Sequence, residues 1–371
     1  MTRFICNLKQ ENPSIEIHFF TNKKIEKIPS EIIDNVTEII IQKRNNGKGG
    51  YWGILRKVLS LRKQFKDLSK YNKYDIIDIH YPHYYMAVTM HFLRKMSNNI
   101  VITPWGSDVL RVDGIRKSIL FKEVLRKSDY ITTSEDNNIR KRIISYLPKI
   151  RDKFVPVAWG SETIDYIMHH LDETDTFRSK ECFGLHGKYV ITCGYNAFRA
   201  QNHDKIIRAI AQIRSQLPDN LLLLFPVSYG AGDKDRYVAE IKKQCQINRL
   251  DAHFIEDYMT VEDVFYLRMA TDMFVHVQNT DAGCASVQEY LLCGKKVVHG
   301  NWIHYRALEA YQPLCYFPVS DFAVLGEAIL NAYHSEDIKV APETLDYIRQ
   351  NGWEKRRKEW NDFFSRIVTK A

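Results

Sequence analysis

Two rounds of the same pattern run along the chain: short apolar segments rich in β-branched residues alternate with longer segments of helical spacing. In the first 150 residues the short segments lie at 15–20, 38–42, 75–80, 99–104 and 129–134. Amphipathic patterns separate them, most clearly over 54–70 and 117–127. A helix between two strands carries the chain back to the same edge of the sheet, so such strands run parallel. We therefore predict a doubly wound parallel α/β sheet in this part of the chain.

The same pattern restarts after a polar stretch near residues 160–185. Five further strands are expected at 188–195, 221–230, 252–258, 272–278 and 295–300. Helical patterns lie between them at 203–216, 234–247, 261–269 and 284–293. A chain of 371 residues is long enough for two such domains. We predict an N-terminal domain over 1–160 and a C-terminal domain over 161–343.

The last segment, 344–371, is predicted to be a C-terminal helix. Its apolar stripe carries five aromatic anchors: Tyr347, Trp353, Trp360, Phe363 and Phe364. A stripe of this size needs another surface to cover it. We expect the helix to pack back on the N-terminal domain.

The net charge of +8 is unevenly placed along the chain. Residues 1–150 hold 27 lysines and arginines against 15 acidic residues, whereas residues 151–371 hold 26 against 30. In segment 49–74, an apolar stripe lies among basic residues, with Tyr51 and Trp52 in front, which is typical of an interfacial helix. An ordinary helix covering the sheet, with a solvated lysine-rich surface, explains this pattern as well. We predict an anionic membrane surface as a partner, and no nucleic acid, because no known nucleic-acid-binding motif is present.

No apolar stretch approaches the ~20 residues that a transmembrane helix needs, and no signal-peptide pattern follows Met1. We expect the protein in the cytoplasm, peripheral at the inner face of the plasma membrane. The seven cysteines are scattered without metal-ligand spacing: Cys6, Cys182, Cys193, Cys245, Cys284, Cys293 and Cys315. No paired carboxylates follow a strand either, so we expect neither a metal nor a cofactor.

The most informative segment is 275–300, which contains an apolar strand, a loop of small residues, a helix and a second strand. Ligands of open α/β sheets bind at such a carboxyl-end loop. The free N–H groups at the helix start suit a diphosphate, and the small residues let it approach: Gly283, Cys284, Ala285 and Ser286. Glu289, further along the helix, is placed to accept hydrogen bonds from ribose hydroxyls. A plain buried helix is the alternative interpretation.

Other candidate residues follow predicted strands elsewhere in the chain. Arg199 is the cation that we expect at a leaving diphosphate. Tyr229, after a long apolar strand, could stack on or hydrogen-bond a base. His80 and His83, together with Asp108, could contact an acceptor or a sugar, although neutral structural histidines are equally common. Of these, His83 and Asp108 are the catalytic candidates of the first domain.

Asp281 and Glu289 form an acidic-x7-Glu spacing, followed by YLLCGKKVV. This segment resembles glycosyltransferase family 4 of the GT-B fold, in which two Rossmann-like domains flank a cleft. The resemblance implies that Asp281 lies by the transferred sugar and that Glu289 holds the ribose. TPWGSDV (103–109) and VPVAWGSE (155–162) are similar to further family segments in the first domain.

ITCGYNAFRAQNH (191–203) is similar to the family segment that supplies groups to the diphosphate, which implies binding roles for Gly194, Asn196, Arg199 and His203. The family's arginine is Tyr195 here and its lysine is absent. Together with FPVSYGAGDKDRY (225–237), the segment also resembles the family 56 fucosamine transferases, which act on lipid-linked saccharides. TRFICNLKQENP resembles the family's first helix, so the first strand of the family is expected to be missing from this sequence.

These observations predict a glycosyltransferase that moves a sugar from a UDP- or GDP-linked donor. The predicted acceptor is a glycan or a lipid-diphosphate-saccharide in bacterial surface polysaccharide synthesis, such as O-antigen or capsule. The family 4 likeness implies retention at the anomeric carbon and the family 56 likeness implies inversion. The alternatives are an epimerase or phosphorylase of the same fold, or a basic polyanion-binding protein. A dinucleotide oxidoreductase is disfavoured, because no GxGxxG follows a strand.

Overall fold

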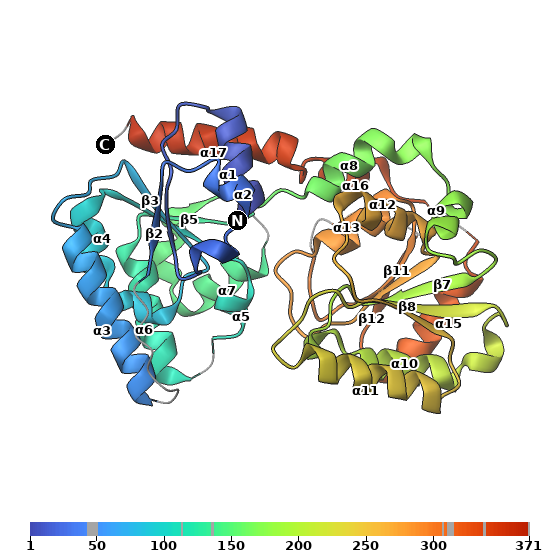
Figure 1. The fold of residues 1–371 in the computed structure, drawn as a ribbon. Coiled ribbons are helices and arrows are strands. Elements are labelled where there is room, and N and C mark those ends of the chain that lie inside the picture. The colour runs from blue at the N-terminus through green and yellow to red at the C-terminus, as the bar shows by residue number, and fades with distance from the viewer. Residues whose placement is uncertain are drawn as a thin grey trace. The chain divides into compact units, whose positions relative to one another are not determined.

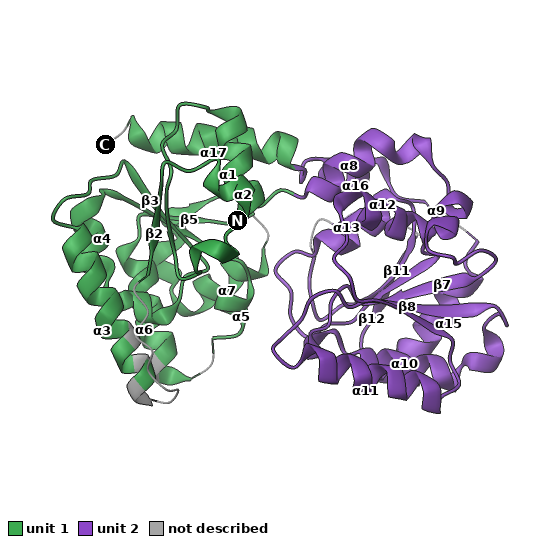
Figure 2. Ribbon diagram, in the orientation of Figure 1, with its two compact units in different colours: residues 1–160, 353–371 green, residues 161–352 purple. Residues whose placement is uncertain are grey.

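The structure, a computed structural model, describes residues 1–42, 51–112, 114–134, 137–305, 308–309, 315–336 and 339–369. The chain divides into two compact units, shown in green and purple in Figure 2. Unit 1 comprises Met1–Gly160 and Trp353–Ala371, and unit 2 comprises Ser161–Gly352. Each unit is a parallel sheet with helices packed on it (Figure 1).

Unit 1 contains two parallel sheets where the sequence predicted one sheet of five strands. β1 (His18–Thr21) pairs with β2 (Glu38–Ile41), and the larger sheet has the order β3 (Ile76–His80), β4 (Asn99–Thr103), β5 (Tyr130–Thr132) and β6 (Phe154–Val155). The two sheets are separate ladders of backbone hydrogen bonds. Contacts near them are made by side chains, such as the edge-on contact of the His18 and Tyr74 rings. β6 was not predicted, because two residues are too few to show an alternating pattern.

The helices of unit 1 are α1 (Thr2–Glu11), α2 (Ser30–Ile33), α3 (Tyr51–Leu68), α4 (Met90–Met96), α5 (Ser107–Leu110), α6 (Ile115–Lys127), α7 (Asn138–Tyr146) and α17 (Trp353–Val368). α1 and α17 lie side by side (Figure 1). Their apolar faces meet around Phe4 and Trp360, and Trp360 donates its ring N–H to the Ala158 oxygen at 3.0 Å. Of the segment interpreted as an interfacial helix, residues 49–50 and the side chains of Tyr51 and Trp52 lie outside the described part.

Unit 2 is a six-stranded parallel sheet in the order β12-β11-β10-β7-β8-β9. Its strands are β7 (Tyr189–Cys193), β8 (Leu221–Pro226), β9 (Ala252–Ile255), β10 (Met273–His276), β11 (Lys296–Gly300) and β12 (Tyr316–Val319). The chain builds outward from β7 to β9 and then returns to the other side of β7 at β10. This reversal of strand order places a ligand crevice at the carboxyl ends of β7 and β10 in folds of this kind.

Figure 1 shows two layers of helices on the sheet of unit 2. One face carries α10 (His203–Gln212), α11 (Lys234–Ile247) and α15 (Leu325–His334). The other carries α8 (Glu162–His170), α9 (Thr176–Cys182), α12 (Val261–Ala270), α13 (Ala285–Leu292) and α16 (Pro342–Arg349). The strands are almost wholly apolar, as expected for a sheet covered on both faces.

The segment predicted as one C-terminal helix is two helices, α16 in unit 2 and α17 in unit 1. The break lies at residues 350–352, where the chain is held close to unit 2. Asn351 donates its side-chain amide to Gln288 at 2.7 Å. A Cβ atom on Gly352 would overlap the carboxylate of Asp165. Only glycine allows this close approach, so the helix is interrupted at Gly352. The aromatic residues that predicted one continuous helix lie on both sides of this break.

Candidate functional site

Glu289 lies on α13, the helix that follows β10, and its carboxylate is buried. Oε1 accepts a hydrogen bond from the Ser161 hydroxyl at 3.0 Å. Oε2 accepts two from the Arg268 guanidinium, at 3.0 and 2.9 Å. Arg268 comes from α12, is buried itself, and also donates to Tyr290 at 3.1 Å and Ser286 at 3.2 Å. The predicted ribose carboxylate is therefore fixed in position by a charged partner from a neighbouring helix.

The first turn of α13 presents the small residues that the sequence predicted. Cys284 is the N-cap residue, and Ala285, Ser286 and Val287 are the first helical residues. The structure places no heavy atom within 4 Å of a Cβ built on Gly283, so the loop before this helix is open on that side. Open space beside the first N–H groups of a helix is what an anionic group requires.

Asp281 lies in the loop between β10 and α13. Its carboxylate accepts hydrogen bonds from the Gln278 amide at 2.5 Å and the Gly283 N–H at 3.2 Å. Oδ2 lies 3.5 Å from Nε2 of His276, the last residue of β10. Burial raises the pKa of Asp281, but the contacts with His276 and the Gly283 N–H outweigh burial, so the pKa is lowered overall. Asp281 is therefore ionised at neutral pH.

The loop after β7 contains Gly194, Asn196 and Asn202, and His203 begins the helix α10 that follows. Gly194 has a φ of +65°, and a Cβ there would lie 2.8 Å from polar atoms of Gln201 and His203. Asn202, also left-handed at a φ of +58°, donates to the Val277 oxygen at 2.7 Å and to Asn279 at 2.8 Å. These bonds tie the loop after β7 to the loop after β10, at the point where the strand order reverses.

His203, expected to contribute to phosphate binding, is fully buried at the start of α10. Its Nδ1 lies 3.1 Å from the Tyr237 hydroxyl. Burial lowers the pKa of His203 to about 4. The ring is therefore neutral at pH 7, and would meet an anion as a neutral group.

Arg199 lies 2.9 Å from Asp233 and 2.8 Å from Glu240, and its guanidinium stacks on the Tyr237 ring. Tyr229 follows β8 with its ring about half exposed. Burial of its hydroxyl raises its pKa, and a hydrogen bond with Asn196 offsets part of that rise. Cys284, Arg268 and Glu289 also act on this hydroxyl. Tyr229 and Asn196 therefore lie near residues of α13. The Arg199 guanidinium instead contacts the carboxylates of Glu240, on α11, and Asp233, just before that helix.

In unit 1, the Asp108 side chain binds the backbone of the loop that follows β4. Its buried carboxylate accepts hydrogen bonds from the N–H groups of Trp105 at 3.0 Å and Gly106 at 2.8 Å. Burial raises the pKa of Asp108 to about 6, and the backbone donors offset only part of the rise. The carboxyl is thus balanced between two protonation states near neutral pH.

Two histidines at the end of β3 have different surroundings. His80 lies 3.0 Å from Asp78 and 3.5 Å from the ring nitrogen of Trp105, so it shares the edge that carries Asp108. His83 stacks on Tyr85 with ring centroids 3.9 Å apart. Trp105 is exposed at this edge.

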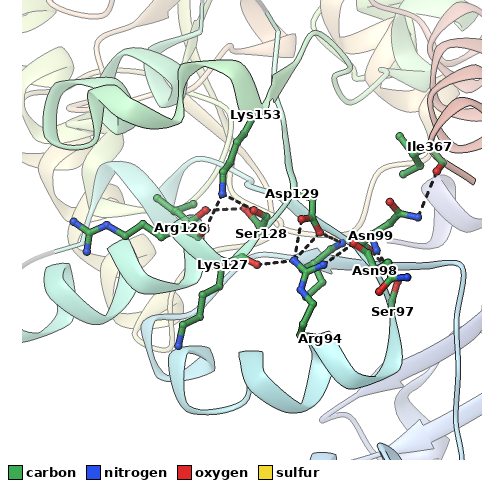
Figure 3. A network of polar contacts seen from close by, with 12 residues as sticks. Arg94, Ser97, Asn98, Asn99, Arg126, Lys127, Ser128, Asp129, Lys153 and Ile367 are labelled. Atoms are coloured by element: carbon green, nitrogen blue, oxygen red, sulfur yellow. Dashed lines mark hydrogen bonds and ion pairs between the residues drawn. The ribbon is translucent and has the colours of Figure 1, made fainter. Parts of the chain in front are cut away.

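A polar network lies at the opposite edge of this sheet, beside the first residues of β4 and β5 (Figure 3). It borders a cavity of about 390 Å³. Arg94 pairs with Asp129 at 2.8 Å and also donates to the Lys127 oxygen. Lys153 donates to the oxygens of Arg126 and Ser128 at 2.7 and 2.6 Å. Arg94 and Lys153 thus bind carbonyls at the end of α6, which is a structural role.

Sequence reasoning missed four polar residues that contact Glu289 or Asp281. Arg268 and Ser161 bind Glu289, and Gln278 and His276 contact Asp281. A single arginine in the apolar helical run VFYLRMA was the available signal for Arg268, because an arginine on a buried helix needs a partner. His276, Asp281 and Cys284 also have ligand atoms within 4.8 Å of one another, a group that could hold a metal ion.

Comparison with known proteins gives one family match and a set of similar solved structures. Residues 1–135 match the family described as glycosyl transferase 4-like. No curated protein matches the chain. No helix in the described ranges is long and apolar enough to cross a membrane.

Solved structures resemble the whole chain at low sequence identity. Anabaena HepE in complex with UDP and glucose is 13% identical with a TM-score of 0.70, over 98% of this chain and 95% of HepE. A glycosyltransferase from Rickettsia africae is 13% identical with a TM-score of 0.71, over 100% and 95%. Sucrose-phosphate synthase from Thermosynechococcus elongatus is 12% identical with a TM-score of 0.71, over 99% and 92%. The chain therefore has the GT-B fold, and its residues 1–135 are similar to the family described as glycosyl transferase 4-like.

Proposed function

We propose that the protein is a glycosyltransferase that moves a sugar from a nucleotide-diphosphate sugar to a glycan or lipid-linked saccharide. The family match over residues 1–135 and the GT-B fold support the reaction class. HepE of this fold has been solved with UDP and with UDP-glucose, which supports a nucleotide-linked donor, with UDP first among the candidates.

The observation that carries the proposal is the position of Glu289. It lies in the helix that follows the loop at the strand-order reversal, with its carboxylate held in place by Arg268. A carboxylate offers about four lone-pair sites. Three are used by the bonds from Ser161 and Arg268, which leaves capacity on Oε1 for a ribose hydroxyl.

The other contacts that we propose with the nucleotide-sugar donor lie at the same edge of the sheet. We assign the diphosphate to the N–H groups around Gly283, Cys284, Ala285 and Ser286, and the transferred sugar to Asp281. We assign the base to the side of Tyr229 and Asn196. We also assign Arg199 to the diphosphate. This contact requires Arg199 to leave Asp233 and Glu240, and exposed ion pairs of this kind contribute little stability.

On the acceptor side we assign Asp108 and His83 as the groups that act on the acceptor hydroxyl, with Trp105 as a surface on which a sugar ring can stack. The raised pKa of Asp108 suits a group that takes up a proton near neutral pH. From the sequence resemblance of residues 191–203 and 225–237 to the fucosamine transferases, we further propose a lipid-diphosphate-saccharide acceptor and a role in bacterial surface polysaccharide synthesis.

Exposed side chains of α6 support contact with an anionic membrane. Ile115 and Ile119, one turn apart, are 80% and 54% exposed, and Lys117 of the same helix is exposed as well. Apolar side chains with a basic rim are typical of a surface that lies on anionic lipid. We therefore place the protein at the cytoplasmic face of the plasma membrane.

The test is calorimetric titration of the purified chain with UDP, GDP, dTDP and ADP. Glu289→Gln keeps the shape of the side chain but removes the charge that ribose hydroxyls bind, and should weaken the preferred diphosphate about tenfold or more. Glu262→Gln, an exposed carboxylate of the same unit, is the control and should leave binding unchanged. If none of the four diphosphates binds, the donor assignment is wrong.

A further inference from the structure

The turn after β3 holds a tyrosine in a backbone conformation that this residue type seldom adopts. Tyr81 has a φ of +53°, in the left-handed region where a Cβ atom crowds the backbone. Its N–H donates to the Thr103 oxygen at 3.1 Å, which ties the turn to the end of β4. Its hydroxyl lies 3.1 Å from the hydroxyl of Ser107, the first residue of α5. Strained residues persist where surrounding contacts hold them, and they gather at binding sites.

Tyr81 and Trp105 form an exposed aromatic pair at this edge of the sheet. Their ring centroids lie 6.2 Å apart, and the ring planes meet at 86°. Tyr81 is 46% exposed and Trp105 is 43% exposed. Two adjoining aromatic residues that keep nearly half of their surface in water do not serve the core of the fold, and such a patch marks a place where something binds.

The Trp105 side chain is held in one orientation by the residues behind it. Its indole N–H donates to Nδ1 of His80 at 3.5 Å, and its ring meets the Trp159 ring edge to face, with centroids 5.0 Å apart. Because Nδ1 of His80 accepts, the ring proton lies on Nε2, which is 3.0 Å from Oδ2 of Asp78. Asp78 in turn accepts a hydrogen bond from the Thr103 hydroxyl at 2.6 Å. Support of this kind, behind a side chain that stays partly exposed, is what a preorganised binding surface requires.

We propose that Tyr81, Trp105 and Ser107 bind a neutral pyranose ring of the acceptor. The C–H groups on one face of a pyranose carry a slight positive charge and pack on the negative face of an aromatic ring. The hydroxyls of Tyr81 and Ser107 can each donate or accept, which suits the hydroxyl groups around the sugar ring. The contacts that the structure describes for these three side chains include no lysine or arginine, so the site suits a sugar better than a phosphate.

This site rests on the proposed function and names the chemistry of the acceptor at its reacting end. Asp108, to which we assign the acceptor hydroxyl, accepts hydrogen bonds from the N–H groups of Trp105 and Gly106 at 3.0 and 2.8 Å. A pyranose bound on Trp105 therefore lies next to this carboxylate. The acceptor thus reacts through a sugar hydroxyl, and any lipid diphosphate that it carries lies outside the site.

The experiment is saturation-transfer NMR on the full chain without nucleotide, with the methyl glycosides of glucose, galactose, mannose and N-acetylglucosamine as probes. When the aromatic protons of the protein are saturated, at least one glycoside should receive saturation, concentrated on the C–H groups of one ring face. Tyr81→Asn and Trp105→Leu should each lower this transfer about fivefold or more. Asparagine tolerates the left-handed conformation and leucine still covers Trp159, so both variants should fold, which circular dichroism checks. Tyr71→Asn, on a tyrosine of unit 1 that is 85% exposed, is the matched control and should retain the transfer.

Transfer that persists unchanged in both variants, or no transfer from the wild-type chain to any of these glycosides, would overturn the proposal. If one variant fails to fold, the other decides, because each removes one of the two rings. Titration of the same chain with UDP separates this site from the proposed function. UDP binding without glycoside binding leaves the donor assignment intact and removes the aromatic site. Glycoside binding that is lost in Tyr81→Asn, in a chain that does not bind UDP, retains the saccharide site and removes the transferase assignment.

Discussion

The Arg268 guanidinium and the Glu289 carboxylate form a buried ion pair, with Nη2 and Oε2 2.9 Å apart. The pair joins α12 to α13 and sets the direction of the carboxylate that we assign to the ribose. Removing one partner leaves the other charged and buried, which costs about 3–5 kcal/mol. We expect Arg268→Met to lower the stability of unit 2 by this amount in urea unfolding.

The double variant Arg268→Met, Glu289→Met is the matched comparison for this pair. It removes both charges, so unit 2 should be clearly more stable than in the single variant. Equal destabilisation of the single and double variants would show that the ion pair is not what makes Arg268 important.

Arg199 and Arg236 offer a matched pair for the diphosphate assignment. Both guanidinium groups lie near Asp233 and Glu240, but Arg236 is on α11 and Arg199 follows β7. Loss of a charge-assisted hydrogen bond costs about 1.5–3 kcal/mol, so we expect Arg199→Gln to weaken UDP binding about tenfold or more. Arg236→Gln should leave UDP affinity unchanged. Equal effects of the two changes in calorimetry would argue against a contact of Arg199 with the ligand.

Gly283 tests how close the diphosphate comes to the backbone. A methyl group at Gly283 meets no protein atom within 4 Å, so Gly283→Ala should fold with unchanged stability. The methyl group would occupy the space that we assign to phosphate oxygens, and we expect UDP affinity to fall about tenfold. Gly232→Ala, which also meets no atom within 4 Å, is the control. Unchanged UDP binding by Gly283→Ala would place the diphosphate elsewhere.

The alternation of strands and helices, and the position of α13 after β10, could be predicted from the sequence. Both depend on local periodicity and on small residues at a helix start, which are visible within a few residues. β6 and β12 were missed because they are short, and β12 contains a proline. The division of the first sheet into two was missed because hydrogen bonding between distant strands leaves no local pattern.

The partners of the candidate residues were the least predictable part of the site. Glu289 is bound by Ser161, at the start of α8, and by Arg268, on α12. No spacing in the sequence connects either residue with Glu289. The contact of His276 with His299 depends on the register of β10 and β11, where these two residues lie opposite each other. The two histidines are visible in the sequence segments VHV and VVH. Their contact can be predicted only once the two strands are known to be neighbours.

Asp108 predicts a specific dependence of stability on pH. Its pKa in the folded protein, about 6, exceeds the value of about 3.9 in an unfolded chain, so folding favours the protonated carboxyl. This contribution is complete below about pH 4 and is lost as the pH rises through 6, a change of about 3 kcal/mol. Asp108→Asn should remove this part of the pH dependence in urea unfolding. Asp34→Asn, on an exposed carboxylate of unit 1, should retain it.

The exposed apolar residues of α6 predict how the protein meets a membrane. Burial of an isoleucine side chain in an apolar environment contributes about 1.5–3 kcal/mol. We expect the double variant Ile115→Ser, Ile119→Ser to lose tenfold or more of its affinity for vesicles rich in anionic lipid, measured by co-sedimentation. Ile247→Ser, on an equally exposed residue of unit 2, should bind like wild type. If raised salt abolishes binding while the double variant still binds like wild type, the basic residues of unit 1 alone account for the attraction, and α6 does not insert.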